Sequence, residues 1–403
     1  MIRGATEAFG RMRTHPGLAV IIVEAFLARL GFSVITFALP FYALSLGMSL
    51  GETGLLISLR IICSVLLKPF MGLAADRFGV KNVYVCSIAG RCLIAVLFML
   101  TSEPWHLFLV RALQGVTSAA REPTSAIMLI QNADEKRVAS TFSWYTTSRS
   151  VGIAMGYPLA GALLTLTDDN YPLVFLFTAA TSAVAFVLVW LFASDASTSS
   201  PVDGLEETSG GSARLALTDW MPFAALALLM AVPASMVQSL FPLIVADRTG
   251  LGKTEIGIIY TLSMGVVVVV GPLLGWASDT ISRRLVFAVR SVASVLSSVL
   301  YCILPGFWGM TTARMVDDIG KAAFKPAWGS VMGDVARSED KRRRGRLVSY
   351  LDTAESLGEA IGPVLAGVIW QNGGIVWLFA ARIVLSVIAE VQAIRALKGP
   401  ATK

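Results

Sequence analysis

The chain of 403 residues has few of the side chains from which most enzyme sites are built. It has only two histidines, His15 and His106, and only 15% of its residues are charged. It contains no G-x-x-x-x-G-K-[ST] phosphate loop and no H-E-x-x-H zinc motif. These absences argue against ATP hydrolysis and zinc catalysis. We therefore expect a protein that is not an enzyme and that uses no cofactor and no metal.

Cysteine is also scarce. The four cysteines all fall within apolar segments and lack the spacing of metal ligands: Cys63, Cys86, Cys92 and Cys302. We expect them to be small apolar side chains of the interior.

Long apolar runs dominate what remains, since 55% of the residues are hydrophobic. Such a composition indicates a protein that crosses a membrane several times. The first run, Leu18 to Tyr42, is too long for the core of a cleavable signal peptide and is expected to stay as the first helix. The hydropathy predicts twelve transmembrane helices at 17–43, 52–72, 82–102, 105–131, 138–166, 173–194, 218–246, 253–276, 285–304, 307–332, 346–371 and 375–396.

The composition changes at 195–217, which is rich in Ser, Thr, Gly and acidic residues and reads as a flexible linker. It divides the chain into a bundle at 1–194 and a bundle at 218–403, and a basic loop is expected at 337–346. Most Lys and Arg outside the apolar runs lie on the side of the N-terminus, which predicts that the linker and both termini are cytoplasmic.

An internal repeat supports two equivalent halves. At one constant offset, Gly54, Asp76, Arg111 and Pro123 meet Gly257, Asp279, Arg314 and Pro326. At a slightly larger offset, Gly152 and Gly156 meet Gly358 and Gly362. Two halves in the same orientation predict a substrate site between them, near the middle of the membrane.

The segment Gly72 to Lys81 (G-L-A-A-D-R-F-G-V-K) is predicted to form a tight polar turn between two helices. A glycine would allow a sharp turn with close packing, and Asp76 could cap the next helix. The segment resembles the signature G-x-L-a-D-r-x-G-r-k of the major facilitator superfamily of secondary transporters, with departures at Ala74 and Val80. The resemblance implies an all-α membrane protein with two pseudo-symmetric six-helix bundles. It also implies a conformational role for Gly72, Asp76, Arg77 and Asp279.

Ionisable residues inside apolar runs are costly unless they are paired or face water, so they are the candidate functional residues. Glu24, Glu122, Asp317 and Asp318 are candidates for proton coupling. The candidates for substrate binding are Arg29, Arg111, Gln114, Arg121 and Lys321.

A polar stripe is predicted along the fourth helix, where Arg111, Gln114 and Arg121 recur at helical spacing. Its start resembles the family's R-x-x-x-G element, whose arginine is associated with proton coupling. The alternative is that Arg111 only holds neighbouring helices together.

The tenth helix has the spacing of local ion pairs between Asp317 and Lys321 and between Arg314 and Asp318. A self-neutralising ladder and a substrate site are both compatible with this pattern.

The eleventh helix carries Asp352, Glu355 and Glu359 on one face. We interpret this face as a closing latch whose partners are Arg60 or Arg149. Arg91, on the third helix, is expected to lie outside its bundle and to be structural.

The fifth helix contains G-x-x-x-G-Y-P-x-x-G, which includes Gly156 and Pro158. It resembles the antiporter signature G-x-x-x-G-P-x-x-G-G of the same family. Small residues permit close helix packing and proline bends the axis, so a gating role for both is expected. A merely glycine-rich packing helix is the alternative.

Together these features predict a proton-coupled efflux antiporter of the cytoplasmic (inner) membrane, working by alternating access. The arginines of the first half favour amphiphilic, anionic or zwitterionic substrates. A lipid, lysolipid or organic-anion transporter of the same fold is the alternative, and a non-transporting receptor or scaffold is a third hypothesis. The expected partners are a small-molecule or lipid-like substrate, protons and membrane lipids. No nucleic acid is expected, and the protein is expected to be a monomer.

Overall fold

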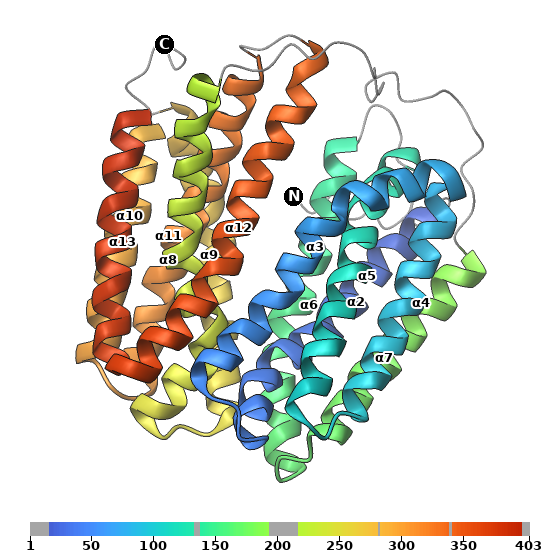
Figure 1. The fold of residues 1–403 in the computed structure, drawn as a ribbon, viewed down its shortest axis with the longest axis horizontal. Coiled ribbons are helices and arrows are strands. Elements are labelled where there is room, and N and C mark those ends of the chain that lie inside the picture. The colour runs from blue at the N-terminus through green and yellow to red at the C-terminus, as the bar shows by residue number, and fades with distance from the viewer. Residues whose placement is uncertain (1–15, 133–137, 193–216, 281–282, 338–340, 397–403) are drawn as a thin grey trace. The chain divides into compact units, whose positions relative to one another are not determined.

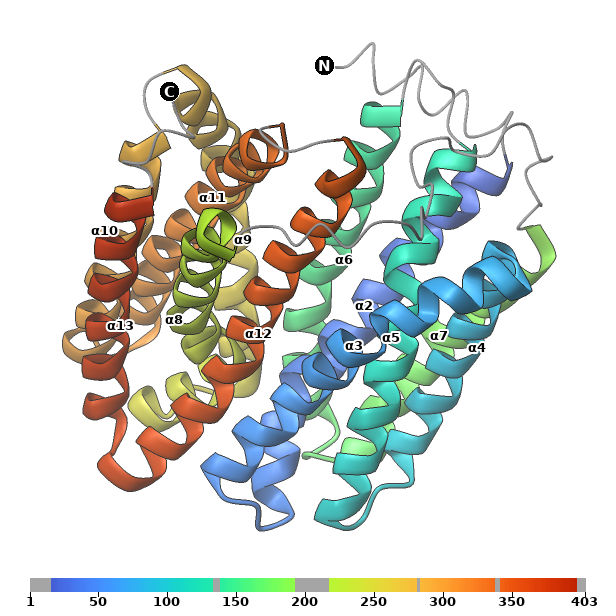
Figure 2. The same ribbon diagram turned by 45° about the horizontal axis from the view of Figure 1, so that its top comes forward.

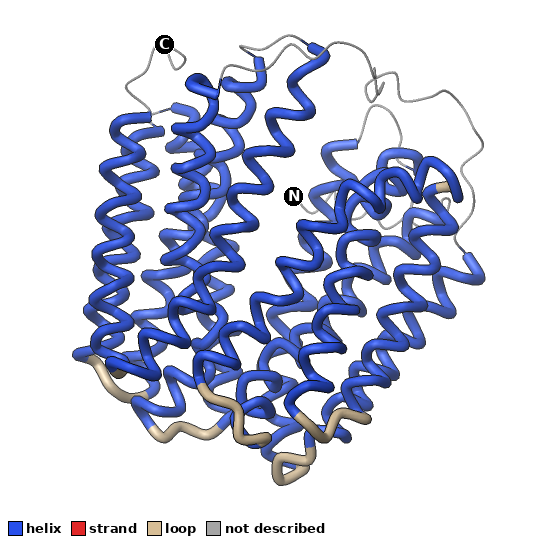
Figure 3. Tube along the Cα trace, in the orientation of Figure 1, coloured by secondary structure: helices blue, strands red, loops and turns tan. Residues whose placement is uncertain are grey.

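The computed structural model describes residues 16–132, 138–192, 217–280, 283–337 and 341–396, and these residues form twelve α-helices (Figure 1). The helices are α2 (Pro16–Ser45), α3 (Leu50–Phe78), α4 (Val80–Met99), α5 (Pro104–Asn132), α6 (Val138–Leu166), α7 (Tyr171–Phe192), α8 (Leu217–Thr249), α9 (Lys253–Thr280), α10 (Arg283–Ile303), α11 (Phe307–Arg337), α12 (Lys341–Gly373) and α13 (Ile375–Ala396). No strand occurs in the described ranges (Figure 3). The predicted all-α fold and its twelve helices are confirmed.

Eight of the described helices are apolar enough, over a sufficient length, to cross a membrane: α2, α3, α4, α7, α8, α9, α10 and α13. Large apolar side chains remain exposed on several of them, such as Trp190 on α7 and Val384 on α13. A row of exposed apolar side chains on a helix is the surface that lipid covers.

The turn predicted at Gly72 to Lys81 is much shorter than expected. The helix α3 continues to Phe78, and Gly79 alone separates it from α4. Gly79 has φ of 85°, a left-handed conformation that glycine adopts without steric cost. Asp76 does not cap α4, because the capping position is Gly79 and no side chain bonds there. A Cβ on Gly72 would meet no described atom within 4 Å, so the expected close packing at Gly72 is wrong.

The basic segment predicted as a loop at 337–346 is largely helical. Arg337 ends α11, and α12 already begins at Lys341, so only 338–340 lie outside the described residues. Helix α12 then runs to Gly373, and Gly374, with φ of 84°, makes a one-residue link to α13.

The contacts divide the chain into two units. Unit 1 comprises Met1–Gly47 and Ile62–Pro201, and unit 2 comprises Met48–Ile61 and Val202–Lys403. The first turns of α3 therefore group with unit 2, and the rest of α3 groups with unit 1.

In unit 1, α2 packs along α6 and α7, and α4 packs along α5 and α7 (Figure 2). Glycines allow the close approach of α6 to α2. A Cβ on Gly156 would lie 2.6 Å from the Cβ of Ser33 and 2.7 Å from the carbonyl oxygen of Leu30. The close packing predicted for this glycine is confirmed, and Pro158 lies two residues further along the same helix.

Unit 2 repeats this order of packing. Helix α8 packs along α12 and α13, and α10 packs along α11 and α13. Gly358 takes the place of Gly152 in this contact, since a Cβ there would lie 2.7 Å from the Cβ of Ala231 on α8. The internal repeat of the sequence is thus a repeat of helix packing.

Candidate functional site

Glu24 on α2 is the central charge of unit 1, and only 1% of it is exposed. Arg121 on α5 holds it with two hydrogen bonds, from Nε to Oε1 (2.9 Å) and from Nη2 to Oε2 (2.6 Å). The hydroxyl of Tyr84 on α4 donates to Oε2 at 2.9 Å. A bidentate guanidinium and a phenol satisfy a buried carboxylate well, so these groups tie α2, α4 and α5 together.

Arg91 on α4 completes this cluster. Its Nη1 lies 3.9 Å from Oε1 of Glu24, its Nη2 donates to the carbonyl of Ala28 at 3.2 Å, and its guanidinium lies 3.8 Å from the ring centroid of Phe32. Arg91 was expected outside the bundle, but it is buried against α2. Sequence position alone does not give the rotation of a helix, which decides this placement.

Glu122 lies apart from Glu24, although it is next to Arg121 in the sequence. Its side chain is 46% exposed, and its Oε2 lies 3.4 Å from Nζ of Lys68 on α3. Neighbouring residues of a helix point about 100° apart, so Arg121 faces the interior and Glu122 does not. The two predicted proton-coupling acids of unit 1 therefore have different surroundings.

The remaining predicted residues of α5 are buried as a pair. Arg111 and Gln114 lie one turn apart, and Nη1 of Arg111 donates to Oε1 of Gln114 at 2.6 Å. The predicted polar stripe thus faces the protein. Arg29 on α2 is half-buried, and the Cβ position of Gly152 lies 3.2 Å from its Cβ.

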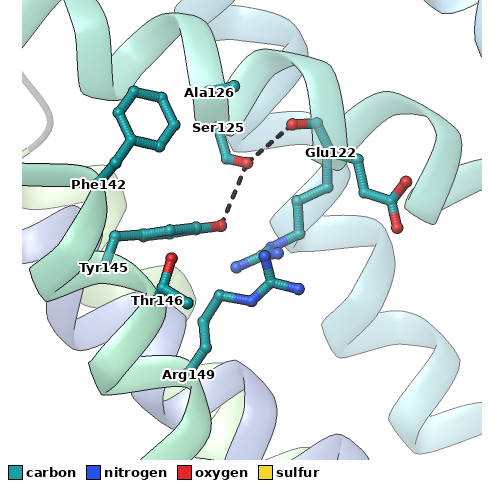
Figure 4. Close-up of a pocket in the computed structure, with 8 residues that line it drawn as sticks. Glu122, Ser125, Ala126, Phe142, Tyr145, Thr146 and Arg149 are labelled. Atoms are coloured by element: carbon teal, nitrogen blue, oxygen red, sulfur yellow. Dashed lines mark hydrogen bonds between the residues drawn. The ribbon is translucent and has the colours of Figure 1, made fainter. Parts of the chain in front are cut away.

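A cavity of about 300 Å³ opens between α5 and α6 of unit 1 (Figure 4). Its lining residues are Arg121, Glu122, Ser125, Ala126, Phe142, Tyr145, Thr146 and Arg149. The hydroxyl of Tyr145 donates to Oγ of Ser125 at 3.3 Å, and Ser125 donates to the carbonyl of Glu122 at 2.9 Å. Figure 4 shows the side chain of Arg149 extending from α6 toward these groups. The cavity combines guanidinium groups, hydroxyls, one carboxylate and the aromatic rings of Phe142 and Tyr145.

Unit 2 buries two carboxylates, Asp317 and Asp318, on α11. Nζ of Lys321 lies 2.7 Å from Oδ2 of Asp317 and 3.1 Å from Oδ1 of Asp318. Nε of Arg314 lies 3.1 Å from Oδ2 of Asp318. The ion pairs predicted along this helix are confirmed. Each of the candidate residues Asp317, Asp318 and Lys321 thus has a charged partner.

Sequence reasoning missed the two arginines that complete this cluster. Arg382 on α13 is fully buried and donates to Asp317, to the carbonyl of Pro233 (2.8 Å) and to the hydroxyls of Ser297 and Ser298 (3.0 Å each). Arg290 on α10 lies 3.9 Å from Asp317. Both stand inside apolar runs, so the rule that selected Asp317 could have found them.

The predicted conformational residues lie as follows. Asp76 and Arg77 are exposed near the end of α3, and the side chain of Asp279 lies outside the described residues. On α12, Asp352 and Glu359 are exposed, and Glu355 is half-buried. Arg60 and Arg149 are half-buried. The gating roles of all these residues, and of Gly72, Gly156 and Pro158, stay predictions.

Long apolar helices that bury their charges in pairs define a helical membrane protein of the transporter class. The sequence profile of the Major Facilitator Superfamily matches residues 21–231 and 223–403. The chain therefore belongs to this superfamily and is a secondary transporter of the membrane.

Relatives and solved structures match the chain over nearly its full length. The chain is 25% identical over 385 residues to the multidrug resistance protein MdtG of Proteus mirabilis. This match covers 91% of this chain and 92% of the relative. It is also 25% identical to the MdtG of Enterobacter lignolyticus, over 91% of this chain and 89% of that one. A bacterial homologue of the human lysosomal transporter Spinster superimposes with a TM-score of 0.79 at 16% identity, over 96% of this chain and 97% of that chain. The nucleoside transporter NupG gives a TM-score of 0.72 at 15% identity, over 94% of this chain and 98% of that chain. Both solved structures share the fold of this chain.

Proposed function

We propose that this transporter exports small amphiphilic molecules from the cytoplasm in exchange for protons, by alternating access. The observation that carries the proposal is the match to proteins named for multidrug resistance, which extends over 91% of this chain and 92% of the relative. Such a match along both halves supports the proposal that the overall activity, and not only one segment, is shared.

The buried carboxylates support the proton part of the proposal. A coupling carboxylate must gain and lose a proton during the cycle. Glu24 is held by Arg121, and Asp317 is held by Lys321 and Arg382. Because a protonated carboxyl no longer attracts a guanidinium, each proton exchange would break or restore an ion pair between helices. That gives two local states, as alternating access requires.

Transport by reconstituted vesicles tests the proposal. Vesicles with an acidic interior should accumulate an external fluorescent amphiphile, and an ionophore that collapses the pH gradient should abolish this accumulation. Glu24→Gln should lose gradient-driven accumulation while keeping exchange of labelled for unlabelled substrate at equal pH. Glu103→Gln, a change at an exposed acid before α5, is the matched control and should behave as the unmodified protein does. Exchange that ignores the gradient in the unmodified protein would refute proton coupling, and no exchange with any amphiphile would favour a receptor or scaffold.

We further propose that the chain lies in the cytoplasmic membrane with both termini in the cytoplasm. The excess of Lys and Arg outside the apolar runs on the side of the N-terminus supports this orientation. A green fluorescent protein fused to the C-terminus should fluoresce, and alkaline phosphatase fused at the same place should be inactive. The opposite result would reverse the orientation.

A further inference from the structure

The charged side chains that line the cavity between α5 and α6 differ in whether they already have an oppositely charged partner. Nε and Nη2 of Arg121 donate hydrogen bonds to Glu24. Oε2 of Glu122 lies 3.4 Å from Nζ of Lys68. Arg149 is different. Among the described residues, no carboxylate lies within 4 Å of its guanidinium, which rests 5.4 Å from the ring centroid of Tyr145. Arg149 is therefore the lining cation with charge left to pair.

Two hydroxyl groups of the cavity, those of Tyr145 and Ser125, do not compete with Arg149 as donors. The proton of Tyr145 is directed to Ser125, and the proton of Ser125 is directed to the carbonyl of Glu122. A ligand in the cavity thus meets the guanidinium fork of Arg149, the hydroxyl of Thr146 and two hydroxyl groups whose protons are already used. A guanidinium fork matches the planar oxygens of a carboxylate or the oxygens of a phosphate.

The other walls of the cavity are apolar. Phe142 and Ala126 line it, and the ring of Tyr145 adds a second aromatic surface (Figure 4). Its volume of about 300 Å³ is at the lower end of the usual range for small-molecule sites. A compact aromatic or short aliphatic body with one charged end fits this size.

From these three features we infer that the α5–α6 cavity binds the anionic end of an amphiphilic molecule. Arg149 contacts its carboxylate or phosphate, and Phe142 and Tyr145 contact its apolar body. The inference rests on the proposed transport function, since it assigns a substrate class to that function, but it concerns binding and can be tested without a gradient. Arg121 does not contact the anion directly. It keeps its bond to Glu24 and adds positive potential to the same wall.

Binding of three probes with one aromatic body tests the sign of the charge. We would measure the binding of 2-naphthoate, 2-naphthamide and 2-naphthylmethylammonium to the purified full-length protein by equilibrium dialysis. The anion should bind about tenfold more tightly than the amide, and the cation should bind more weakly than both. Equal binding of all three, or tighter binding of the cation, would overturn the inference.

Two variants of Arg149 and one control variant locate the anion. Arg149→Gln should weaken the binding of 2-naphthoate about tenfold and leave 2-naphthamide nearly unchanged. Arg395→Gln, which removes an exposed cation from α13, is the matched control for net charge and should change neither. Unchanged 2-naphthoate binding by a folded Arg149→Gln protein would overturn the site. Arg149→Lys, which keeps the charge, should recover part of the affinity.

A cysteine in the cavity gives a readout that does not depend on Arg149. In a chain with its four cysteines replaced by serine, Thr146→Cys should react faster with an anionic methanethiosulfonate than with its cationic analogue. 2-Naphthoate should protect this cysteine and 2-naphthylmethylammonium should not. The opposite ranking, or no protection, would place the anion elsewhere even if the Arg149 variants do not fold.

The same probes separate two sources of the anion. Lysophosphatidylglycerol that displaces 2-naphthoate with much higher affinity than decanoate identifies a lipid head group. Decanoate as the stronger competitor identifies a free organic acid. Either result supports the inference, and failure of both to displace 2-naphthoate contradicts it. If export is later disproved, these binding results still stand by themselves.

Discussion

Unit 1 and unit 2 pack their helices in the same order, but they take their buried charges from different positions of the repeat. In unit 1 the carboxylate is Glu24 on α2, and its cations come from α4 and α5. In unit 2 the carboxylates lie on α11, and cations reach them from α10, α11 and α13. The helix packing follows the repeat, whereas each half carries its own arrangement of ion pairs.

An arginine that occurs at the same position of both repeats has different partners in the two units. Arg111 and Arg314 are equivalent in the repeat, and so are Gln114 and Asp317. Arg111 bonds to the neutral Gln114, whereas Arg314 bonds to Asp318 and lies 4.5 Å from the ring centroid of Phe241. The repeated arginine therefore bonds to a neutral side chain in unit 1 and to a carboxylate in unit 2. The following changes would alter this contrast, from the largest expected effect to the smallest.

Asp317→Ala should have the largest effect, because it leaves Arg290, Lys321 and Arg382 without their shared partner. Breaking a buried ion pair costs about 3–5 kcal/mol, and we expect the upper end of this range here. The free energy of unfolding in mixed detergent micelles would measure the loss. Asp317→Asn, which keeps the shape and one acceptor oxygen, should lose less. A loss below about 1 kcal/mol for Asp317→Ala would contradict the central role of this carboxylate.

In unit 1 the pair of Glu24 and Arg121 should be coupled by about 3 kcal/mol. Each of Glu24→Met and Arg121→Met should destabilise the protein, because each leaves a buried charge with fewer partners. The double variant should recover most of the loss, since replacing a buried ion pair by apolar side chains is often nearly neutral. A double-mutant cycle in the same micelles would measure the coupling energy. Additive losses would show that the two side chains act independently.

Glycine contacts should be alike in the two units, which makes them a test of the repeat. Gly156→Ala and Gly362→Ala each place a methyl group against a facing helix, and each should cost about 1–3 kcal/mol. Gly265→Ala on α9 is the matched control. A Cβ there meets no described atom within 4 Å, so the change should be neutral or stabilise the helix by up to about 1 kcal/mol. A clear difference between the losses of unfolding free energy at Gly156 and Gly362 would show that the two helix contacts are not equivalent.

The smallest effect is expected at Glu122. Its pair with Lys68 is partly exposed, and such pairs contribute about 0–1 kcal/mol. Glu122→Gln should therefore leave the thermal unfolding temperature almost unchanged, in contrast to Glu24→Gln. A large drop for Glu122→Gln would show that Glu122 is as important as Glu24.

The sequence predicted the fold well because the relevant signals are local. Runs of apolar residues have the length of a membrane, and the repeat is visible in the positions of Gly54, Arg111 and Gly152. The pairs on α11 were also predictable, since residues three and four apart on a helix are neighbours. The helix ends differed, since α3 continues to Phe78 and α12 begins at Lys341.

The partners of Glu24 could not be predicted in the same way. Its bonds to Arg121 and Tyr84 join residues far apart in the sequence, and they depend on how α2, α4 and α5 are rotated about their axes. No local spacing determines these rotations. Arg382 and Arg290 were missed for another reason. Both stand in apolar surroundings on α13 and α10, so the cost of a buried charge marks them as it marks Asp317, but neither has an oppositely charged residue three or four positions away on its own helix that faces it.

The bonds of Arg382 have a consequence for how the protein is made. Helix α13 is the last described helix to leave the ribosome, and it carries the guanidinium that joins Asp317 to α8 and α10. Until α13 is inserted, Asp317 must rely on Lys321 and Arg290, and the carbonyl of Pro233 lacks this donor. Glu24 is without its partner for a shorter part of synthesis, because Arg121 follows on α5. Unit 1 can thus complete its charge pairing early in synthesis, whereas unit 2 completes its own only when α13 joins the other helices.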